Sequence, residues 1–264
     1  MASVDVERQG AAGIIRFSNP PYGVMATPHA QEMLTAFRAL TCDSSVQTII
    51  ITGGQPGIFN RHWDVSEFVA IIDAEDAGLP LPDMGGAAGH QPFSQLIEEI
   101  AEAPQPVIAA INGLCMGGGF ELALACDLRI ADPKVEAIGP IECRVGTHPA
   151  GSGPSRLPRI VGEAKALNII LRGLTFTGAE AYEMGLVTEL ADDPVAHALE
   201  ISRVWEGRVS EGLANAKRLI RSAFDRTLAE GVAEEGRLHG EVISSPAVRK
   251  NLRRLLPPAD IRDL

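Results

Sequence analysis

The sequence predicts an α/β fold built around a largely parallel β-sheet. In the first half of the chain, short β-branched runs alternate with segments whose apolar residues recur at helical spacing. Some of these runs are apolar at nearly every position, as in parallel strands that are covered on both faces. The chain has 264 residues, of which 45% are hydrophobic, so it can bury a large core without a disulfide or a metal. This alternation is typical of an α/β layer fold.

The N-terminal elements show the pattern clearly. Residues 12–17 are predicted to form a strand that ends at Asn19-Pro20-Pro21. A helix is predicted over residues 29–40, because apolar side chains recur there three and four residues apart. Residues 47–52 are a β-branched run stopped by Gly53-Gly54, which suits a strand buried on both faces.

The later part of the chain changes from mixed to helical. The other predicted strands cover residues 107–111 and 128–131, and the other predicted helices cover residues 94–103, 120–126, 163–171 and 213–224. Residues 73–92 hold many glycines and prolines with little periodicity, which predicts a long loop. From about residue 196 the strand signals stop and only helical spacing continues.

Charge and hydropathy exclude several classes of partner. Asp and Glu total 34 against 23 Lys and Arg, a net charge of −11, so the chain would repel a nucleic-acid backbone. No apolar run approaches the ~18 residues of a membrane span, and the N-terminus has no secretory signal. The four cysteines form no C-x-x-C pair or zinc-site spacing and are expected to be buried free thiols. We therefore expect a cytoplasmic protein with neither a nucleic-acid nor a membrane partner.

The most informative stretch begins with a buried strand that leads into Gly117-Gly118-Gly119 and then into a helix. Glycines let the backbone approach a ligand closely, and free amides at a helix start attract negative charge. The stretch therefore suits a nucleotide phosphate or an oxyanion formed during a reaction. Its spacing matches neither a P-loop nor a dinucleotide-binding glycine motif. A tight strand-to-helix turn packed in the core would explain the glycines equally well.

Two glutamates are candidates for proton transfer. Glu121 follows the glycines in an otherwise apolar helix, where burial would raise its pKa toward the range used in general acid–base catalysis. The alternative is that Glu121 lies on a solvent-facing turn. Between Glu121 and Glu142 there is enough chain for a strand and a return to the same end of the sheet. Glu142 could equally pair with Arg144, so the sequence leaves open whether the two carboxylates meet.

Around these residues the sequence resembles the enoyl-CoA hydratase/isomerase (crotonase) superfamily. The resemblance covers most of residues 5–225 and is most specific in the middle of the chain. There it rests on Asn112-Gly113, Gly117-Gly118-Gly119, Glu121-Leu122-Ala123, Cys126-Asp127 and Arg129-Ile130-Ala131. It continues through Glu142, Gly146-Thr147, Pro149, Gly153, Arg156-Leu157, Arg159-Ile160-Val161-Gly162, Gly173, Thr177, Ala179-Glu180-Ala181 and Gly185-Leu186-Val187, and Asn19-Pro20 also fits.

The resemblance implies a crotonase-like ββα spiral. It places the spiral core in residues 1–195 and a C-terminal helical region for trimerisation in residues 196–264. The implied assembly is a homotrimer or a dimer of trimers, and the implied substrate is an acyl-CoA thioester. Coenzyme A enters as part of that substrate, so neither a metal nor another cofactor is expected.

The resemblance also implies roles for single residues. The backbone N–H groups of Gly118 and Trp63 map to the oxyanion hole that holds the thioester oxygen. In hydratases two glutamates share the reacting water, and these map to Glu121 and Glu142. Glu121 would help to orient and deprotonate the water that attacks Cβ, and Glu142 would deliver a proton to Cα. The substrate-binding positions implied nearby are His62, Asp64, Gly117 and Gly146.

The sequence departs from the family pattern close to these positions. Arg61 and His62 stand where small residues are usual, and Trp63 is bulky, although any non-proline residue supplies a backbone amide. The segment upstream of Glu142 is one residue longer than the common hydratase pattern. His148 lies in a region that is usually small and glycine-rich, where it either faces the site or only packs.

The presence of both glutamates favours a 2-enoyl-CoA hydratase, which adds water reversibly and syn to a trans-2-enoyl-CoA to give a 3-hydroxyacyl-CoA. One alternative is another reaction of the same superfamily, such as double-bond isomerisation or hydrolysis of a thioester or carbon–carbon bond. Enzymes of that kind often keep only one of the two glutamates. A second alternative is a non-catalytic protein with the crotonase fold.

Overall fold

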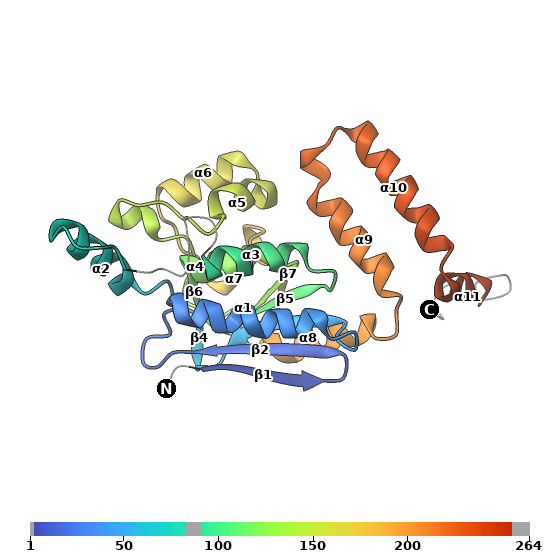
Figure 1. The fold of residues 1–264 in the computed structure, drawn as a ribbon, viewed down its shortest axis with the longest axis horizontal. Helices are drawn as coiled ribbons and strands as arrows, with labels where there is room; N and C mark the ends of the chain where they lie inside the picture. The colour runs from blue at the N-terminus through green and yellow to red at the C-terminus, as the bar shows by residue number, and fades with distance from the viewer. Residues whose placement is uncertain (1–2, 83–90, 255–264) are drawn as a thin grey trace. The chain divides into compact units, whose positions relative to one another are not determined.

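The computed structural model describes residues 3–82 and 91–254. It divides into two compact units, one formed by residues 1–103 and 107–206 and the other by residues 104–106 and 207–264. The first unit contains both β-sheets, and the second is helical (Figure 1). The α/β class and the late change to helices, both predicted from the sequence, are confirmed.

The larger sheet has six strands in the order β1-β2-β3-β5-β7-β9. Its bounds are β1 (Ser3–Gln9), β2 (Ala12–Ser18), β3 (Thr48–Gly53), β5 (Val107–Ile111), β7 (Leu128–Ala131) and β9 (Glu189–Leu190). Only β1 pairs antiparallel, with β2, and every other neighbouring pair is parallel. The largely parallel sheet is therefore confirmed.

A smaller sheet of three parallel strands follows the order β4-β6-β8. Its strands are β4 (Gly57–Asn60), β6 (Gly113–Met116) and β8 (Ile138–Gly139). Each comes directly after a strand of the larger sheet, so the chain makes the step β3–β4, then β5–β6, then β7–β8. Because the three strands are parallel, their carboxyl ends lie at one edge of the small sheet.

Helices follow each of these strand pairs and complete three turns of a ββα spiral. The helices after the first pair are α2 (Val65–Asp76) and α3 (Pro92–Glu102), and α4 (Gly118–Ala125) follows the second. After the third pair come the 3-10 turn η1 (Glu142–Val145), α5 (Gly153–Val161), α6 (Glu163–Leu171) and α7 (Gly178–Glu183). This is the spiral that the resemblance implied.

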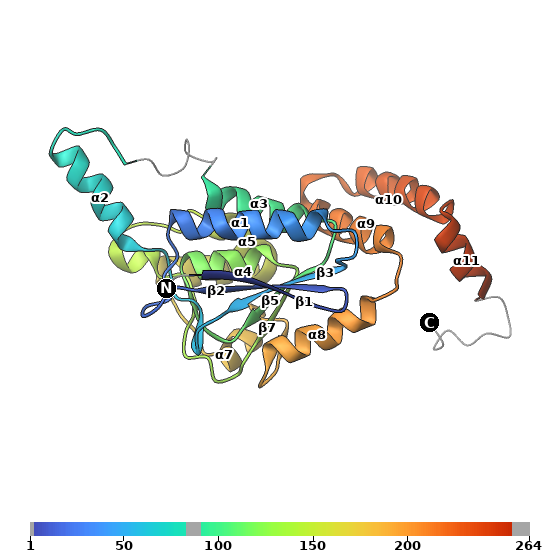
Figure 2. The same ribbon diagram turned by 60° about the horizontal axis from the view of Figure 1, so that its bottom comes forward.

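The core lies on both faces of the larger sheet, because side chains alternate along each buried strand. In β3, Ile49 and Ile51 join one hydrophobic cluster and Ile50 joins the other. The first cluster is covered by α1 (Thr27–Cys42), α3 and α4, and the second by α8 (Pro194–Trp205), on the opposite side of the sheet (Figure 2). Strands β3 and β5 are apolar at most positions because neither face is exposed to water.

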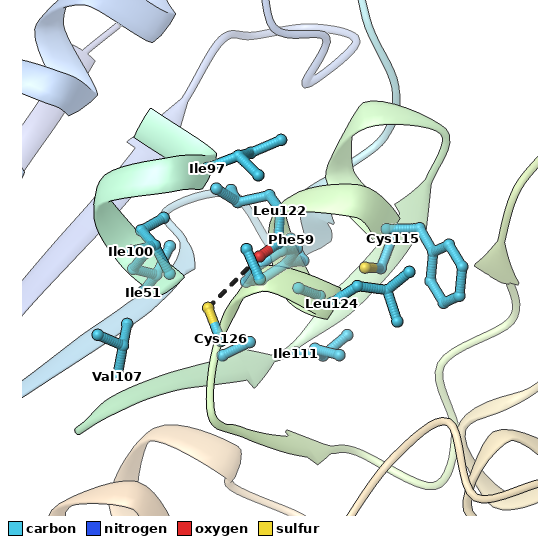
Figure 3. Packing of buried hydrophobic residues seen from close by; sticks show 14 of the residues in the cluster. Ile51, Phe59, Ile97, Ile100, Val107, Ile111, Cys115, Leu122, Leu124 and Cys126 are labelled. Atoms are coloured by element: carbon cyan, nitrogen blue, oxygen red, sulfur yellow. Dashed lines mark hydrogen bonds between the residues drawn. The ribbon is translucent and has the colours of Figure 1, made fainter. Parts of the chain in front are cut away.

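Figure 3 shows the part of the first cluster that surrounds α4. Cys126 is buried there, and its thiol donates to the Leu122 carbonyl at 3.4 Å. All four cysteines are free, and Cys115 is buried as well. The prediction of four buried thiols is wrong for Cys42, which is exposed on the last turn of α1, and for Cys143, which is half-buried.

The second unit contains α9 (Ser210–Arg221), the 3-10 turn η2 (Ala223–Asp225), α10 (Leu228–Ile243) and α11 (Pro246–Arg254). The helix predicted over residues 213–224 corresponds to α9 and η2. Because α8 packs on β3 and β5, the first unit extends through Glu206. In the described ranges, no helix is long and apolar enough to span a membrane. The trimeric assembly stays a prediction.

The predicted loop over residues 73–92 is only partly correct. Its first residues belong to α2, which extends from Val65 to Asp76, and its last residue begins α3 at Pro92. Residues 83–90, in the middle of that stretch, lie outside the described residues. Helix α2 was not predicted from the sequence. Its apolar residues, among them Phe68 and Ile72, are exposed and do not form the buried apolar face that helical periodicity detects.

Candidate active site

The candidate site lies at the carboxyl edge of the small sheet. The chain leaves β4 at Asn60 and reaches Trp63, leaves β6 at Met116 and reaches Gly117, and leaves β8 at Gly139 and reaches Glu142. The fold therefore brings together three segments that are far apart in the sequence. The sequence-predicted catalytic and oxyanion-hole residues all belong to these three segments or to the helix that follows the second.

The glycines that begin α4 are required by the backbone. Gly117 precedes the first helical residue with φ 51° and ψ −126°, a conformation open to glycine. A Cβ on Gly119 would lie 2.1 Å from the carbonyl oxygen of Asn60, so α4 packs directly against the end of β4. The glycines thus form the tight strand-to-helix turn that the sequence left as an alternative. That turn also presents the first amides of α4.

Two backbone N–H groups in this region lack an intramolecular acceptor. Gly118 is the first residue of α4, where an N–H has no acceptor inside the helix. At Trp63, the preceding carbonyl of His62 accepts from the Met25 N–H at 2.9 Å. A trans peptide directs its N–H opposite to its C=O, so the Trp63 N–H points away from Met25. Within residues 3–82 and 91–254, neither the Gly118 nor the Trp63 amide has an acceptor.

Gly118 and Trp63, which carry these two amides, are far apart in the sequence but in contact in the fold. A Cβ on Gly118 would lie 3.9 Å from Cε3 of the Trp63 indole and 3.4 Å from Cζ of Phe93. The Trp63 and Phe93 rings are themselves in contact, with centroids 5.1 Å apart and planes inclined by 56°. An aromatic pair therefore borders the start of α4 on one side.

Glu121 lies in the first turn of α4 and is 3% exposed. Its Oε1 accepts from the Gly153 N–H at 2.7 Å. Burial raises the pKa of this carboxyl from 4.5 to about 7; hydrogen bonds from Gly153 and Gly151 lower it, and the charge of Glu142 raises it further. The alternative of a solvent-facing Glu121 is wrong, because α4 is buried on every side.

Glu142 begins η1 and lies close enough for its charge to act on Glu121. Its Oε1 would lie 3.2 Å from a Cβ on Gly117, and its Oε2 accepts from the Ile141 N–H at 2.8 Å. Burial raises the pKa of Glu142, while backbone hydrogen bonds and the nearby His62 lower it. The alternative pairing with Arg144 is wrong, since that guanidinium donates to the Gly173 carbonyl and to Thr175.

His62 lies beside Glu142 at the edge of this arrangement. A Cβ built on Gly117 would lie 3.4 Å from the Cβ of His62 and 3.2 Å from Oε1 of Glu142, so both side chains border Gly117. The ring Nδ1 is 2.6 Å from the Trp63 carbonyl oxygen. Because a carbonyl only accepts, Nδ1 carries the proton, and Nε2 is the nitrogen that can accept.

The other predicted binding positions have structural roles or open surroundings. Asp64 caps α2, and its Oδ1 accepts from the Ser66 N–H at 2.9 Å. Gly146 ends η1 in the left-handed region with no atom within 4 Å of a built Cβ. His148 is exposed. Contact of Asp64, Gly146, His62 or Gly117 with a substrate stays a prediction.

The sequence analysis missed two contributors to the site. Phe93 comes from α3 and contacts both Gly118 and Trp63. The Gly151-Ser152-Gly153 segment lets the chain pass beside Glu121, since a Cβ on Gly151 would lie 2.7 Å from its Oε2. The available sequence signal was the pair of glycines, Gly151 and Gly153, separated by a single residue at the start of α5. Nothing in the sequence pointed to Phe93.

The arrangement can support proton transfer beside a developing negative charge. Glu121, whose pKa is raised to about 7, can exchange a proton near neutral pH, and the raised pKa of Glu142 favours its protonated form. The free N–H groups of Gly118 and Trp63 can hold an oxygen that gains charge during the reaction. In the part of the chain that the structure describes, no three His, Cys, Asp or Glu side chains are grouped as a metal site requires.

Comparison with known proteins agrees with this chemistry. The family described as enoyl-CoA hydratase/isomerase matches residues 7–256. A probable enoyl-CoA hydratase of Bacillus subtilis is 32% identical over 247 residues, 92% of this chain and 91% of the relative. The mitochondrial methylglutaconyl-CoA hydratase of Mus musculus is 31% identical over 91% of this chain and 76% of its own. The crystal structure of an enoyl-CoA hydratase from Thermoplasma volcanium superposes with a TM-score of 0.83 at 27% identity, covering 96% of each chain.

The raised pKa of Glu121 predicts how the Glu121→Gln variant changes stability with pH. Because the folded-state pKa is about 7 and the ordinary value is 4.5, the native state holds this proton more tightly than the unfolded chain. The contribution of this proton to the free energy of unfolding is therefore complete below pH 4.5 and is lost as the pH rises through 7. Gln cannot ionise, so the variant should gain about 3 kcal/mol relative to wild type between pH 4.5 and pH 8.5.

Urea unfolding at both pH values measures this gain. The exposed α3 residue Glu98 provides a control, since Glu98→Gln also removes one negative charge. An identical difference between Glu121→Gln and wild type at both pH values would show that Glu121 is not a carboxyl with a raised pKa.

Proposed function

The chain belongs to the enoyl-CoA hydratase/isomerase family, and we propose that it is an enoyl-CoA hydratase. The proposed reaction is the reversible syn addition of water to a trans-2-enoyl-CoA, which gives a 3-hydroxyacyl-CoA. One observation supports the proposal: the charge of Glu142 acts on the buried Glu121, in a region where the amides of Gly118 and Trp63 have no acceptor among the described residues. A hydration uses proton-transfer groups and an oxyanion site, and these four residues are our candidates for those roles.

The thioester carbonyl oxygen binds between the N–H groups of Gly118 and Trp63. When water attacks Cβ, electrons move toward the carbonyl and the oxygen gains enolate charge. Fixed N–H donors stabilise that charge more than the neutral ground state, which lowers the barrier. The positive end of α4 acts at the same point, because Gly118 is its first residue.

The two glutamates move the protons. Glu121 takes a proton from the attacking water, and its pKa of about 7 leaves a large ionised fraction at neutral pH. Glu142 gives a proton to Cα and therefore acts in its protonated form, which its raised pKa favours. Both carboxyls lie on one side of the bound chain, so the hydroxyl and the hydrogen add to the same face.

Coenzyme A belongs to the substrate in this scheme, and no metal or redox group takes part. The proposed assembly is a homotrimer or a dimer of trimers. Because some relatives are named methylglutaconyl-CoA hydratase, the substrates to be tested include a branched acyl group that carries a free carboxylate as well as straight chains.

Loss of either glutamate should abolish hydration. General acid–base groups contribute about 100- to 10,000-fold, so Glu121→Gln and Glu142→Gln should each lower kcat by that amount. The assay follows loss of the conjugated absorbance across a trans-2-enoyl-CoA series from about C4 to C16 and methylglutaconyl-CoA, with Glu98→Gln as the charge control. Absence of turnover by wild type on every substrate would contradict the proposal and favour another reaction of the family.

Proline at position 118 should remove one of the two oxyanion donors without removing the helix. Proline has no N–H and is favoured in the first turn of a helix, where that N–H has no intrahelical acceptor. Gly118→Pro should therefore lower kcat/KM by about 100- to 1,000-fold. Gly118→Ala keeps the amide and meets the same 3.4 Å contact with Phe93, so it separates loss of the donor from crowding.

Measuring the melting temperatures of the two variants checks that both fold. If Gly118→Pro were as active as Gly118→Ala, the Gly118 amide would have no role in catalysis.

A further inference from the structure

The large side chain of Trp63 is anchored to the first turn of α2. The indole Nε1–H donates to Oε2 of Glu67 at 2.9 Å. Glu67 lies in the first turn of α2, four residues after Trp63. The large side chain thus gives the Trp63 backbone an attachment that alanine or glycine could not provide.

The same carboxylate also binds the start of α1. Its Oε1 accepts from the Thr27 N–H at 2.9 Å, and its Oε2 accepts from the Thr27 hydroxyl at 3.0 Å. Thr27 is the first residue of α1, a long helix packed on the core. Glu67 therefore ties the indole of Trp63 to a rigid part of the fold through three hydrogen bonds.

Three further contacts restrain the Trp63 segment. The His62 carbonyl and the Asp64 N–H both bond to Met25, at 2.9 and 2.7 Å. The indole ring packs against Phe93, beside the Gly118 that supplies the other free amide. With its peptide held by Met25 and its ring held by Glu67 and Phe93, Trp63 keeps its N–H in one direction.

We propose that Glu67 is a positioning residue that fixes the Trp63 amide relative to the Gly118 amide through the indole of Trp63. The inference rests on the proposed function, in which these two amides hold the thioester oxygen. Donors act on a developing oxyanion only when they are placed at hydrogen-bond distance from it, so a loosened Trp63 stabilises the enolate less. The effect falls on kcat more than on KM, because the charge is larger in the transition state than in the bound substrate.

The variant Glu67→Gln tests this role with little change in shape. A carboxylate accepts at both oxygens, whereas an amide accepts at one and donates from the other. In Glu67→Gln either the indole N–H or the Thr27 N–H must lose its acceptor. Trp63→Phe removes the indole N–H from the opposite side while keeping an aromatic ring against Phe93. Glu75→Gln, at an exposed position in the same helix, controls for the loss of charge.

Steady-state kinetics give the first readout. Glu67→Gln and Trp63→Phe should each lower kcat by about 10- to 100-fold while KM changes less than about threefold. The double variant should be no slower than the slower single variant, because both act through one hydrogen bond. Glu75→Gln should match wild type. Retention of wild-type kcat by Trp63→Phe, which has no N–H to donate to Glu67, or multiplied losses in the double variant, would overturn the proposal.

Ligand polarisation gives a second readout that does not require turnover. Hydrogen bonds to the carbonyl of a conjugated thioester shift its absorbance to longer wavelength. The probe is trans,trans-2,4-hexadienoyl-CoA, bound to Glu121→Gln so that it is not consumed. Adding Trp63→Phe, which removes the indole N–H, should reduce the shift, and an unchanged shift would overturn the proposal. If wild type hydrates no enoyl-CoA, the proposed function fails, and this shift alone then decides the role of Glu67.

Discussion

The burial of the Glu121 carboxylate is the constraint on which the site depends. A carboxyl in an apolar helix is stable only with donors close to it, and here the Gly153 N–H supplies one at 2.7 Å. The chain must pass close enough to offer that amide, and the glycines at 151 and 153 leave the room. Burial with few donors keeps the pKa of Glu121 near neutrality, which is the property that proton transfer requires.

The spiral explains why these groups meet. Each turn places one strand in the small parallel sheet, so the residues that follow the three strands lie along one edge. The first turn delivers Trp63, the second Gly118 and Glu121, and the third Glu142. Each segment is anchored separately: Trp63 by Met25 and Glu67, Gly118 by the packing of α4 on β4, and Glu142 by the Ile141 amide. The fold thus brings to one edge of the small sheet the residues to which we assign proton transfer and oxyanion binding.

The sequence predicted the elements whose patterns follow from burial and missed those that do not. Strands β3 and β5 are covered on both faces and were evident as apolar runs, whereas β4, β6 and β8 are short and carry mixed residues. Local chemistry singled out the glycine stretch and Glu121 but left open whether the glycines form a packed turn and whether Glu121 is buried. The meeting of Glu121 with Glu142, and the contacts of Phe93 and Glu67, depend on pairings between distant segments that no local pattern records.

Infrared titration of the Glu121 carboxyl tests the central claim most directly. The difference between wild-type and Glu121→Gln spectra isolates the protonated carboxyl band, which can be followed from about pH 4 to pH 9. The account predicts a midpoint at about 7, moving lower in Glu142→Gln because the neighbouring charge is then absent. A midpoint at 4.5, or one that Glu142→Gln leaves in place, would contradict it.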